Sequence, residues 1–145
     1  MNKKNNQEEK DLMKRWVFDH AYAMIEELNM GRSEAFRQAY LVRELLVALG
    51  QGEVVFEYVK KNGDERKARG TLCKGISEKY DAYKYKDKVN RDGYGKLDIA
   101  YWDLDKEGFR NFSIANVKGI VEVTIKNNEL HVRKATLSKR EFHEL

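Results

Sequence analysis

The spacing of the apolar residues changes once along this chain, and that change most constrains the fold. Over residues 7–28 and again over residues 36–47, apolar side chains recur every three or four positions, which is typical of amphipathic helices. After Gly52 the spacing becomes two, because apolar and polar residues alternate over residues 54–59. Alternation of this kind predicts a half-buried strand. The pattern therefore predicts an α+β protein in which the helices come first.

The two predicted helices are joined by a very short turn at Asn29-Met30-Gly31. Ser33 is expected to cap the second helix, which is expected to end at Gly50. So short a connection predicts a helical hairpin over residues 11–50. Residues 1–10 are polar and are expected to form a flexible N-terminus.

The remainder predicts about six short antiparallel strands in a meander, closed into a small barrel over residues 51–135. Asn62-Gly63 is a strong hairpin signal, and Gly70 is expected where the backbone bends or another segment approaches closely. Asn116-Val117-Lys118-Gly119 predicts one tight turn. Residues 74–96 are predicted to be a long irregular loop, and residues 136–145 a charged tail.

The net charge of +4 is unevenly distributed. Residues 60–96 hold 12 of the 28 Lys and Arg residues but only 6 of the 24 Asp and Glu residues. A basic excess confined to one stretch favours an anionic partner for that region, although a charged surface that only aids solubility would look the same.

Several segments of the chain resemble the WYL_2 family, a group of small phage and Bacteroidetes proteins described as Sm-like SH3 β-barrels. The segments are Val55-Phe56-Glu57-Tyr58, Asn62-Gly63-Asp64, Ala68-Arg69-Gly70-Thr71-Leu72, Tyr101-Trp102-Asp103 and Gly108-Phe109-Arg110-Asn111-Phe112, and Ser33 to Tyr40 is similar to the helical stretch that often precedes that barrel. The resemblance covers roughly residues 13–125 and implies an N-terminal helical hairpin followed by a small antiparallel Sm/SH3-like β-barrel. WYL-type barrels are implied to bind nucleic acid or small nucleotide-like ligands, often as regulators. A literal Trp-Tyr-Leu tripeptide is absent here.

Two groups of residues are candidates for nucleic-acid binding. In the first, tyrosines alternate with lysines, a composition that suits single strands because bases stack on rings while cations hold phosphates. In the second, basic side chains share the outward face of the early barrel strands. The candidates are Lys79, Tyr80, Tyr83, Lys84, Tyr85, Lys86 and Lys88 in the first group and Lys67, Arg69 and Arg110 in the second.

Each group also has a purely structural interpretation. The tyrosines of the first group would pack back onto the barrel or the helices. The cations of the second group would form ordinary cross-strand pairs, for example with Glu57 or Asp98.

No arrangement of residues predicts catalysis, a metal site or a cofactor, so we expect a binding protein and not an enzyme. The three histidines are scattered, and His20 is expected to pack against the helices. Asp103, Asp105 and Glu107 lack the remaining ligands of a calcium loop. Cys73 is the single cysteine, and its basic neighbours predict a lowered pKa, but a buried position in a strand is the simpler expectation.

The expected partner is RNA or DNA, and two alternatives stay open. The protein could be a phage-derived adaptor or inhibitor that binds a host protein through helix residues around Trp16, Phe18 and Tyr40, or a sensor or sponge for small nucleotides. Pairing of edge strands could also give a homo-oligomer. No apolar run reaches the roughly 18 residues of a membrane span and no signal peptide is evident, so the expected location is the cytoplasm.

Overall fold

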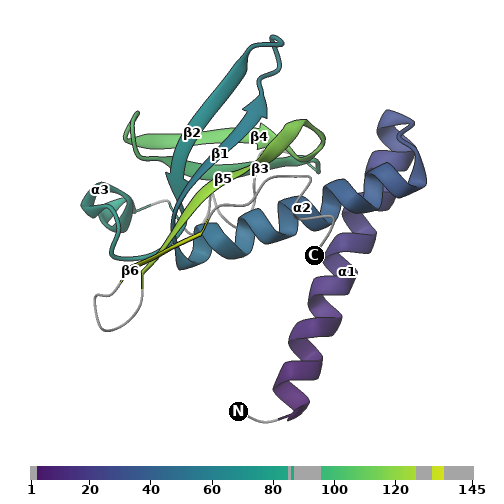
Figure 1. The fold of residues 1–145 in the computed structure, drawn as a ribbon, viewed down its shortest axis with the longest axis horizontal. Helices are drawn as coiled ribbons and strands as arrows, with labels where there is room; N and C mark the ends of the chain where they lie inside the picture. The colour runs from purple at the N-terminus through teal and green to yellow at the C-terminus, as the bar shows by residue number, and fades with distance from the viewer. Residues whose placement is uncertain (1–2, 85, 87–95, 127–131, 136–145) are drawn as a thin grey trace.

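The computed structural model describes residues 3–84, 86, 96–126 and 132–135, with side chains for residues 7–84, 86 and 96–126. Two helices packed together precede an antiparallel sheet (Figure 1), which confirms the predicted fold class. The elements in chain order are α1 (Lys3–Leu28), α2 (Arg32–Gln51), β1 (Gly52–Val59), β2 (Glu65–Thr71), α3 (Glu78–Ala82), β3 (Asp98–Asp103), β4 (Gly108–Ser113), the 3-10 turn η1 (Ile114–Asn116), β5 (Val117–Lys126) and β6 (Val132–Ala135).

The helical hairpin forms as the apolar stripes predict, with small differences at the helix ends. α1 begins at Lys3 and not near Gln7. The N-cap of α2 is Gly31 and not Ser33, because the extended Gly31 residue offers its carbonyl to the Ala35 backbone N–H at 2.9 Å and Ser33 already lies in the first turn. Val17, Ala21 and Met24 of α1 are fully buried in the shared core.

The sheet has six strands in the order β4-β3-β2-β1-β5-β6, and every pairing is antiparallel. The predicted meander holds only from β1 to β4, because β5 returns to pair with β1. The predicted tight turn at residues 116–119 is wrong: η1 makes the reversal and Val117 already belongs to β5. The buried side-chain amide of Gln38 on α2 fixes this geometry by donating to the carbonyls of Ile114 at 2.9 Å and Val117 at 2.7 Å.

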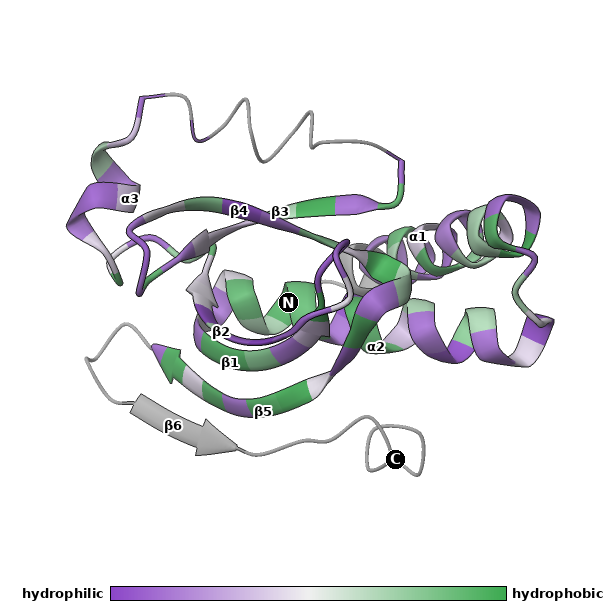
Figure 2. Cartoon of the chain, turned by 90° about the horizontal axis from the view of Figure 1, so that it is seen from above, coloured by the Kyte–Doolittle hydropathy of each residue, from purple (hydrophilic) through white to green (hydrophobic). Residues whose placement is uncertain are grey.

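The strands curve into a ring, and the hydrophobic C-terminal half of α2 lies across one end of it (Figure 2). Alternate residues of β1 point inward, since Val54, Phe56 and Tyr58 are buried while Val55 and Glu57 are only partly so. The core joins helix and barrel through Leu41, Val42, Leu45, Leu49, Val54, Phe56, Tyr58, Tyr101, Phe112, Ile114, Val117 and Ile120. Each fully buried leucine in it contributes about 2 kcal/mol of hydrophobic stabilisation. One end of the barrel is therefore closed by apolar packing.

Two glycines occupy the positions that their sequence context predicts. Gly63, in the turn between β1 and β2, has a φ of 92°, which only glycine adopts easily. At Gly70 in β2, a Cβ would lie 2.6 Å from Cδ2 of Tyr101. Gly70 therefore permits the close approach of β3 that completes the barrel interior.

Residues 74–96 are not wholly irregular, because they contain the short helix α3, capped by the Ser77 hydroxyl, which accepts from the Tyr80 backbone N–H at 3.2 Å. The Asp92-Gly93-Tyr94-Gly95 stretch, the expected turn at Asn127-Asn128 and the tail 136–145 lie outside the described residues. Among the helices that the structure describes, none combines the length and apolar character needed to cross a membrane.

Candidate functional site

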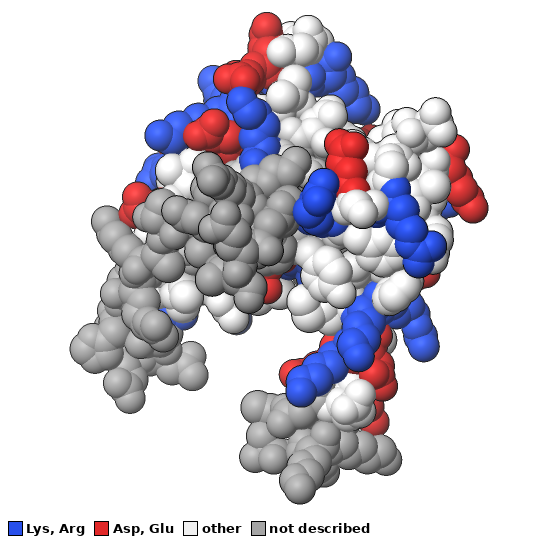
Figure 3. All heavy atoms as spheres, turned by 45° about the vertical axis from the view of Figure 1, so that its right-hand side comes forward, with Lys and Arg blue, Asp and Glu red and all other residues white. Residues whose placement is uncertain are grey.

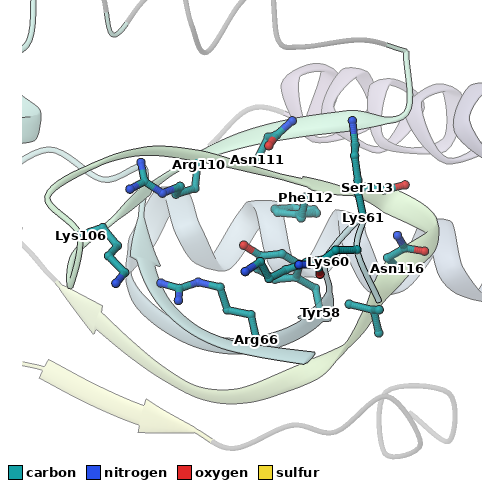
Figure 4. Close-up of a pocket in the computed structure, with 12 residues that line it drawn as sticks. Tyr58, Lys60, Lys61, Arg66, Lys106, Arg110, Asn111, Phe112, Ser113 and Asn116 are labelled. Atoms are coloured by element: carbon teal, nitrogen blue, oxygen red, sulfur yellow. The ribbon is translucent and has the colours of Figure 1, made fainter. Parts of the chain in front are cut away.

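A cavity of about 500 Å³ opens at the end of the barrel away from α2. We call it the mouth pocket; the tip of the β1–β2 hairpin, the β3–β4 turn, β4 and η1 line it. Figure 4 looks into this opening, with Tyr58 and Phe112 at its centre. Among the described residues that line it, none is acidic and five are basic: Lys60, Lys61, Arg66, Lys106 and Arg110.

The floor of the mouth pocket is aromatic and closed. Tyr58 is 4% exposed and Phe112 is 2% exposed, and both rings pack with Phe56 and the fully buried Tyr101. The hydroxyls of Tyr58 and Tyr101 lie 2.8 Å apart and share a hydrogen bond. The pocket is therefore blind, because the core fills the space between its floor and α2.

A buried carboxylate anchors one side of the pocket. Asp103, at the end of β3, is fully buried and accepts a charge-assisted hydrogen bond from Nη2 of Arg66. Its other oxygen, Oδ1, accepts from the backbone N–H groups of Asp105 at 3.0 Å and Lys106 at 2.9 Å. Asp103 thus holds both the side chain of Arg66 and the backbone that carries Lys106.

The ionisation of this network follows from its contacts. Burial by itself raises the pKa of Asp103, but the hydrogen bonds from Arg66 and the two backbone N–H groups outweigh it, so the net pKa lies below the ordinary 3.8. The hydrogen bond to Asp103 raises the pKa of Arg66. Burial, followed by the Tyr58 hydrogen bond, raises the pKa of Tyr101. A fixed ion pair therefore lies at one side of the pocket, and a neutral tyrosine lies behind its floor.

Three of the five cations at the mouth have no carboxylate partner within the described residues. Lys60 and Lys106 form no ion pair there, and the guanidinium of Arg110 donates only to the Phe109 carbonyl, at 3.0 Å. Lys61 lies 3.4 Å from Asp98. Arg66, Lys106 and Arg110 gather on one side of the opening, whereas Ser113 and Asn116 lie on the other (Figure 4). Arg66, Lys106 and Arg110 suit an anion on their side of the opening, and the other side holds two neutral polar side chains together with Lys61.

The outward face of β2 is also basic, but its arginine is neutralised. Arg69 pairs with Glu53 at 3.3 Å and with Asp105 at 3.2 Å. Lys67 is exposed and lies opposite Glu57 in the strand register. On the face drawn in Figure 3, basic and acidic groups are interspersed and no single-sign patch forms. The cross-strand pairing considered from the sequence is therefore present for Arg69, with other partners than Glu57 or Asp98.

Tyr80 and Tyr83, the described tyrosines of the first candidate group, lie against the outer face of β3 and β4. Tyr80 is 4% exposed and packs with Trp102 and Phe109, at ring-centroid distances of 5.7 and 6.0 Å. Tyr83 contacts the same two rings but is 39% exposed. The tyrosines thus cover a second, outer aromatic cluster.

The lysines of this group are placed differently from one another. Lys79 forms an ion pair with Glu107. Lys86 donates to the Asp81 carbonyl at 2.7 Å, and Lys84 is exposed. Tyr85 and Lys88 lie outside the described residues.

Of the ten residues that the sequence singles out, eight lie in the described part of the chain, and Arg110 is the one of these eight that lines the mouth pocket. Sequence reasoning missed Arg66, although a signal for it was present: it shares the inward parity of Ala68 and Gly70 on β2. It also missed Lys60 and Lys106. Both lie in turns, where the alternation of apolar and polar residues does not predict the direction of a side chain. The sequence therefore located the basic region but not the surface on which its charges converge.

The helix residues considered for a protein partner are partly accessible. Phe18 is 44% exposed and Tyr40 is 38% exposed. Trp16 is half-buried and stacks on His20 at a centroid distance of 3.9 Å, so His20 packs as expected. A protein partner stays a prediction.

The described residues contain no group of three or more acidic, histidine or cysteine side chains placed to hold a metal ion. Cys73 lies just beyond β2 and is only half-buried. Burial raises its pKa, against the lowering that its basic neighbours suggested; Lys126 opposes the shift but does not reverse it.

A protein-family model described as WYL_2, Sm-like SH3 beta-barrel fold, matches residues 42–118, from the middle of α2 to the start of β5. Searches of curated proteins and of solved structures found no match.

Proposed function

This chain belongs to the WYL_2 family of Sm-like SH3 β-barrels, and from that premise we propose that it binds nucleic acid through the mouth pocket. The observation that carries the proposal is the set of unpaired cations, Lys60, Lys106 and Arg110, around a lining without carboxylates. A concave surface whose charges are all positive concentrates anions more strongly than a flat surface of mixed charge.

The shape of the pocket supports the same proposal. Phosphates are the repeating anions of a nucleic acid, and lysine and arginine contacts to them supply most of the affinity of sequence-independent binding. The floor formed by Tyr58 and Phe112 is almost fully buried, so the pocket offers phosphate contacts above it and no exposed ring face for stacking. The cavity of about 500 Å³ lies in the range of small-molecule sites and so suits one nucleotide of a strand better than a duplex, and we propose a single strand.

The test is fluorescence anisotropy with labelled single-stranded RNA and DNA of about 12 nucleotides, read at about 50 mM and about 200 mM salt. A double variant at the mouth, Lys106→Ala with Arg110→Ala, removes two cations from the pocket. Its matched control, Lys67→Ala with Arg69→Ala, removes two cations from the outward face of β2.

We expect the wild type to bind and to weaken steeply with salt. The mouth variant should lose affinity and reduce the slope of log K against log salt by about 1.4, since each single-strand phosphate contact contributes about 0.7. The control should bind like the wild type. Absence of binding at low salt contradicts the function, and equal losses in the two variants contradict its location.

A free nucleotide is the second candidate, because the cavity of about 500 Å³ falls in the range typical of small-molecule sites. A ligand that binds only the folded state raises the melting temperature. Thermal shifts across a panel of mono-, di- and trinucleotides test this. If no nucleotide raises the melting temperature but oligonucleotides bind, the ligand is a nucleic-acid strand and not a free nucleotide.

A further inference from the structure

Resting on the proposed function, we infer that the mouth pocket receives the phosphorylated end of a strand, a terminal phosphate monoester, in place of an internal phosphodiester. Two independent features of the pocket lead to this inference. One is its closed floor, and the other is the number of cations that meet on one side of it.

The closed floor prevents a strand from threading the barrel. Tyr58 and Phe112 are almost fully buried, and Tyr101 behind them is completely so. A strand that enters must stop inside or turn back through the same opening. A strand end meets this condition without bending, whereas an internal nucleotide must be looped out of the chain.

The cations come from three separate segments. Arg66 belongs to β2, Lys106 to the β3–β4 turn and Arg110 to β4, and the three gather on one side of the opening (Figure 4). An internal phosphodiester carries one negative charge, but a terminal phosphate monoester carries nearly two at neutral pH and offers three acceptor oxygens. The monoester therefore matches the cluster better in both charge and hydrogen-bonding capacity.

Asp103 prepares this cluster before any ligand arrives. One carboxylate oxygen holds Nη2 of Arg66, and the other accepts from the Lys106 backbone N–H at 2.9 Å. The guanidinium has five N–H donors in a rigid fork, of which the contact with Asp103 occupies one edge. Arg66 is thereby held in place while keeping donors for phosphate oxygens, and less conformational freedom is lost on binding.

The opposite side of the pocket suits the rest of the terminal nucleotide. The side chains of Ser113 and Asn116 carry no charge, and no protein hydrogen bond to either is present within the described residues. They lie across the aromatic floor from Arg66, Lys106 and Arg110, and Lys61 lies on their side of the opening (Figure 4). A sugar hydroxyl or a base edge placed there would find neutral donors and acceptors.

The experiment compares four oligonucleotides of one sequence, each labelled internally: one with a 5′-phosphate, one with a 3′-phosphate, one with hydroxyls at both ends, and a closed circle. We expect one of the phosphorylated forms to bind about tenfold more tightly than the hydroxyl form, and the circle to bind no better than the hydroxyl form. The preference should shrink as pH falls below about 6, where the dianionic monoester takes up one proton and becomes a monoanion.

The same two double variants complete the test. Lys106→Ala with Arg110→Ala should remove the preference for a phosphorylated end, while Lys67→Ala with Arg69→Ala should preserve it. If all four oligonucleotides bind equally, end recognition is wrong although nucleic-acid binding stands. If none binds at low salt, the proposed function and this inference both fail.

Discussion

The mouth pocket and the outward face of β2 are both basic, yet they differ in what their cations contact. Arg66 and Arg69 lie three residues apart on the same strand and point to opposite sides of it. Around Arg66 the neighbouring cations Lys60, Lys106 and Arg110 have no carboxylate partner among the described residues, whereas Arg69 faces both Glu53 and Asp105. The number of cations in a region therefore says less about anion binding than the number left unneutralised.

The difference has a simple physical basis. On an exposed strand face, each basic side chain can reach an acidic one on the neighbouring strand, and such pairs reduce the local potential while adding little stability. At the mouth, Asp103 is buried beneath the surface and committed to Arg66 and two backbone N–H groups, while Asp98 lies near Lys61 and none of the other described lining cations. Burial of the acid thus leaves the rim positive.

The largest effect should follow from removing that buried acid. Asp103→Asn breaks the ion pair with Arg66, and we expect a loss of about 3 kcal/mol in the free energy of unfolding, at the low end for a buried pair because Arg66 is partly exposed. Urea denaturation measures it. The control is Asp105→Asn, whose pair with Arg69 is exposed, and which should cost less than about 1 kcal/mol. Similar losses in the two variants would contradict the distinction between the two regions.

The pH dependence of stability tests the same carboxylate. Because the pKa of Asp103 in the folded protein lies below its ordinary 3.8, its contribution is present above about pH 4 and is lost as pH falls through the lowered value. The gap in unfolding free energy between the wild type and Asp103→Asn should therefore be constant near neutrality and narrow in acid. Urea titrations at a series of pH values measure the gap, and a gap that widens in acid would contradict the assignment.

The next prediction concerns a carboxylate added to the mouth pocket, which would then resemble the outward face of β2. Asn116→Asp places a carboxylate in the lining of the pocket with almost no change in shape. We expect oligonucleotide affinity to fall about tenfold, or about 1.4 kcal/mol, as measured by anisotropy at low salt. Asn116→Ala removes the amide without adding charge and should lose clearly less. Equal losses would show that the amide matters and the charge does not.

A smaller effect is expected on the outer face itself. Arg69→Ala removes the pairs with Glu53 and Asp105, and exposed pairs of this kind contribute about 0.5 kcal/mol. Chemical denaturation should show a shift of that size, with unchanged oligonucleotide binding. A loss above about 2 kcal/mol would mean that this face contributes to stability as the mouth does.

The smallest effect is expected when an acidic group is removed from the outward face of β2. Glu53→Gln removes one of the two acids that neutralise Arg69 without changing the size of the side chain. We expect at most about a twofold gain in affinity at low salt, which disappears at physiological salt because exposed charges are screened. A gain in affinity as large as the loss expected for Asn116→Asp would indicate that the oligonucleotide binds on the outward face of β2.

Much of the fold could be predicted from local pattern. The alternation of β1, the Asn62-Gly63 turn and the close approach at Gly70 each depend on residues near one another in sequence or on a property of glycine itself. The end of the meander could not be predicted, because β5 returns to pair with β1 and the Gln38 amide that contacts this reversal lies 76 residues from Ile114 and 79 from Val117. Long-range hydrogen bonds of this kind leave no periodic signal.

The candidate site shows the same division. From residue types alone, a basic region and an aromatic one could be named, and Arg110 was among them. Tyr80 was expected to offer a ring for stacking, but it packs on Trp102 and Phe109 and is 4% exposed. Which aromatic ring is accessible depends on what packs over it, and that is a property of the folded chain.

The sequence by itself determined two helices followed by antiparallel strands, and a middle stretch rich in cations, because hydrophobic period, turn residues and charge are local properties. Only the tertiary structure decided which cations stay unneutralised. Neutralisation requires an acid within a few ångströms, and Asp103 reaches Arg66 across 37 residues of chain while Glu53 reaches Arg69 across 16. Such distances are set by strand pairing and barrel closure, so the mouth pocket exists only once the barrel has formed.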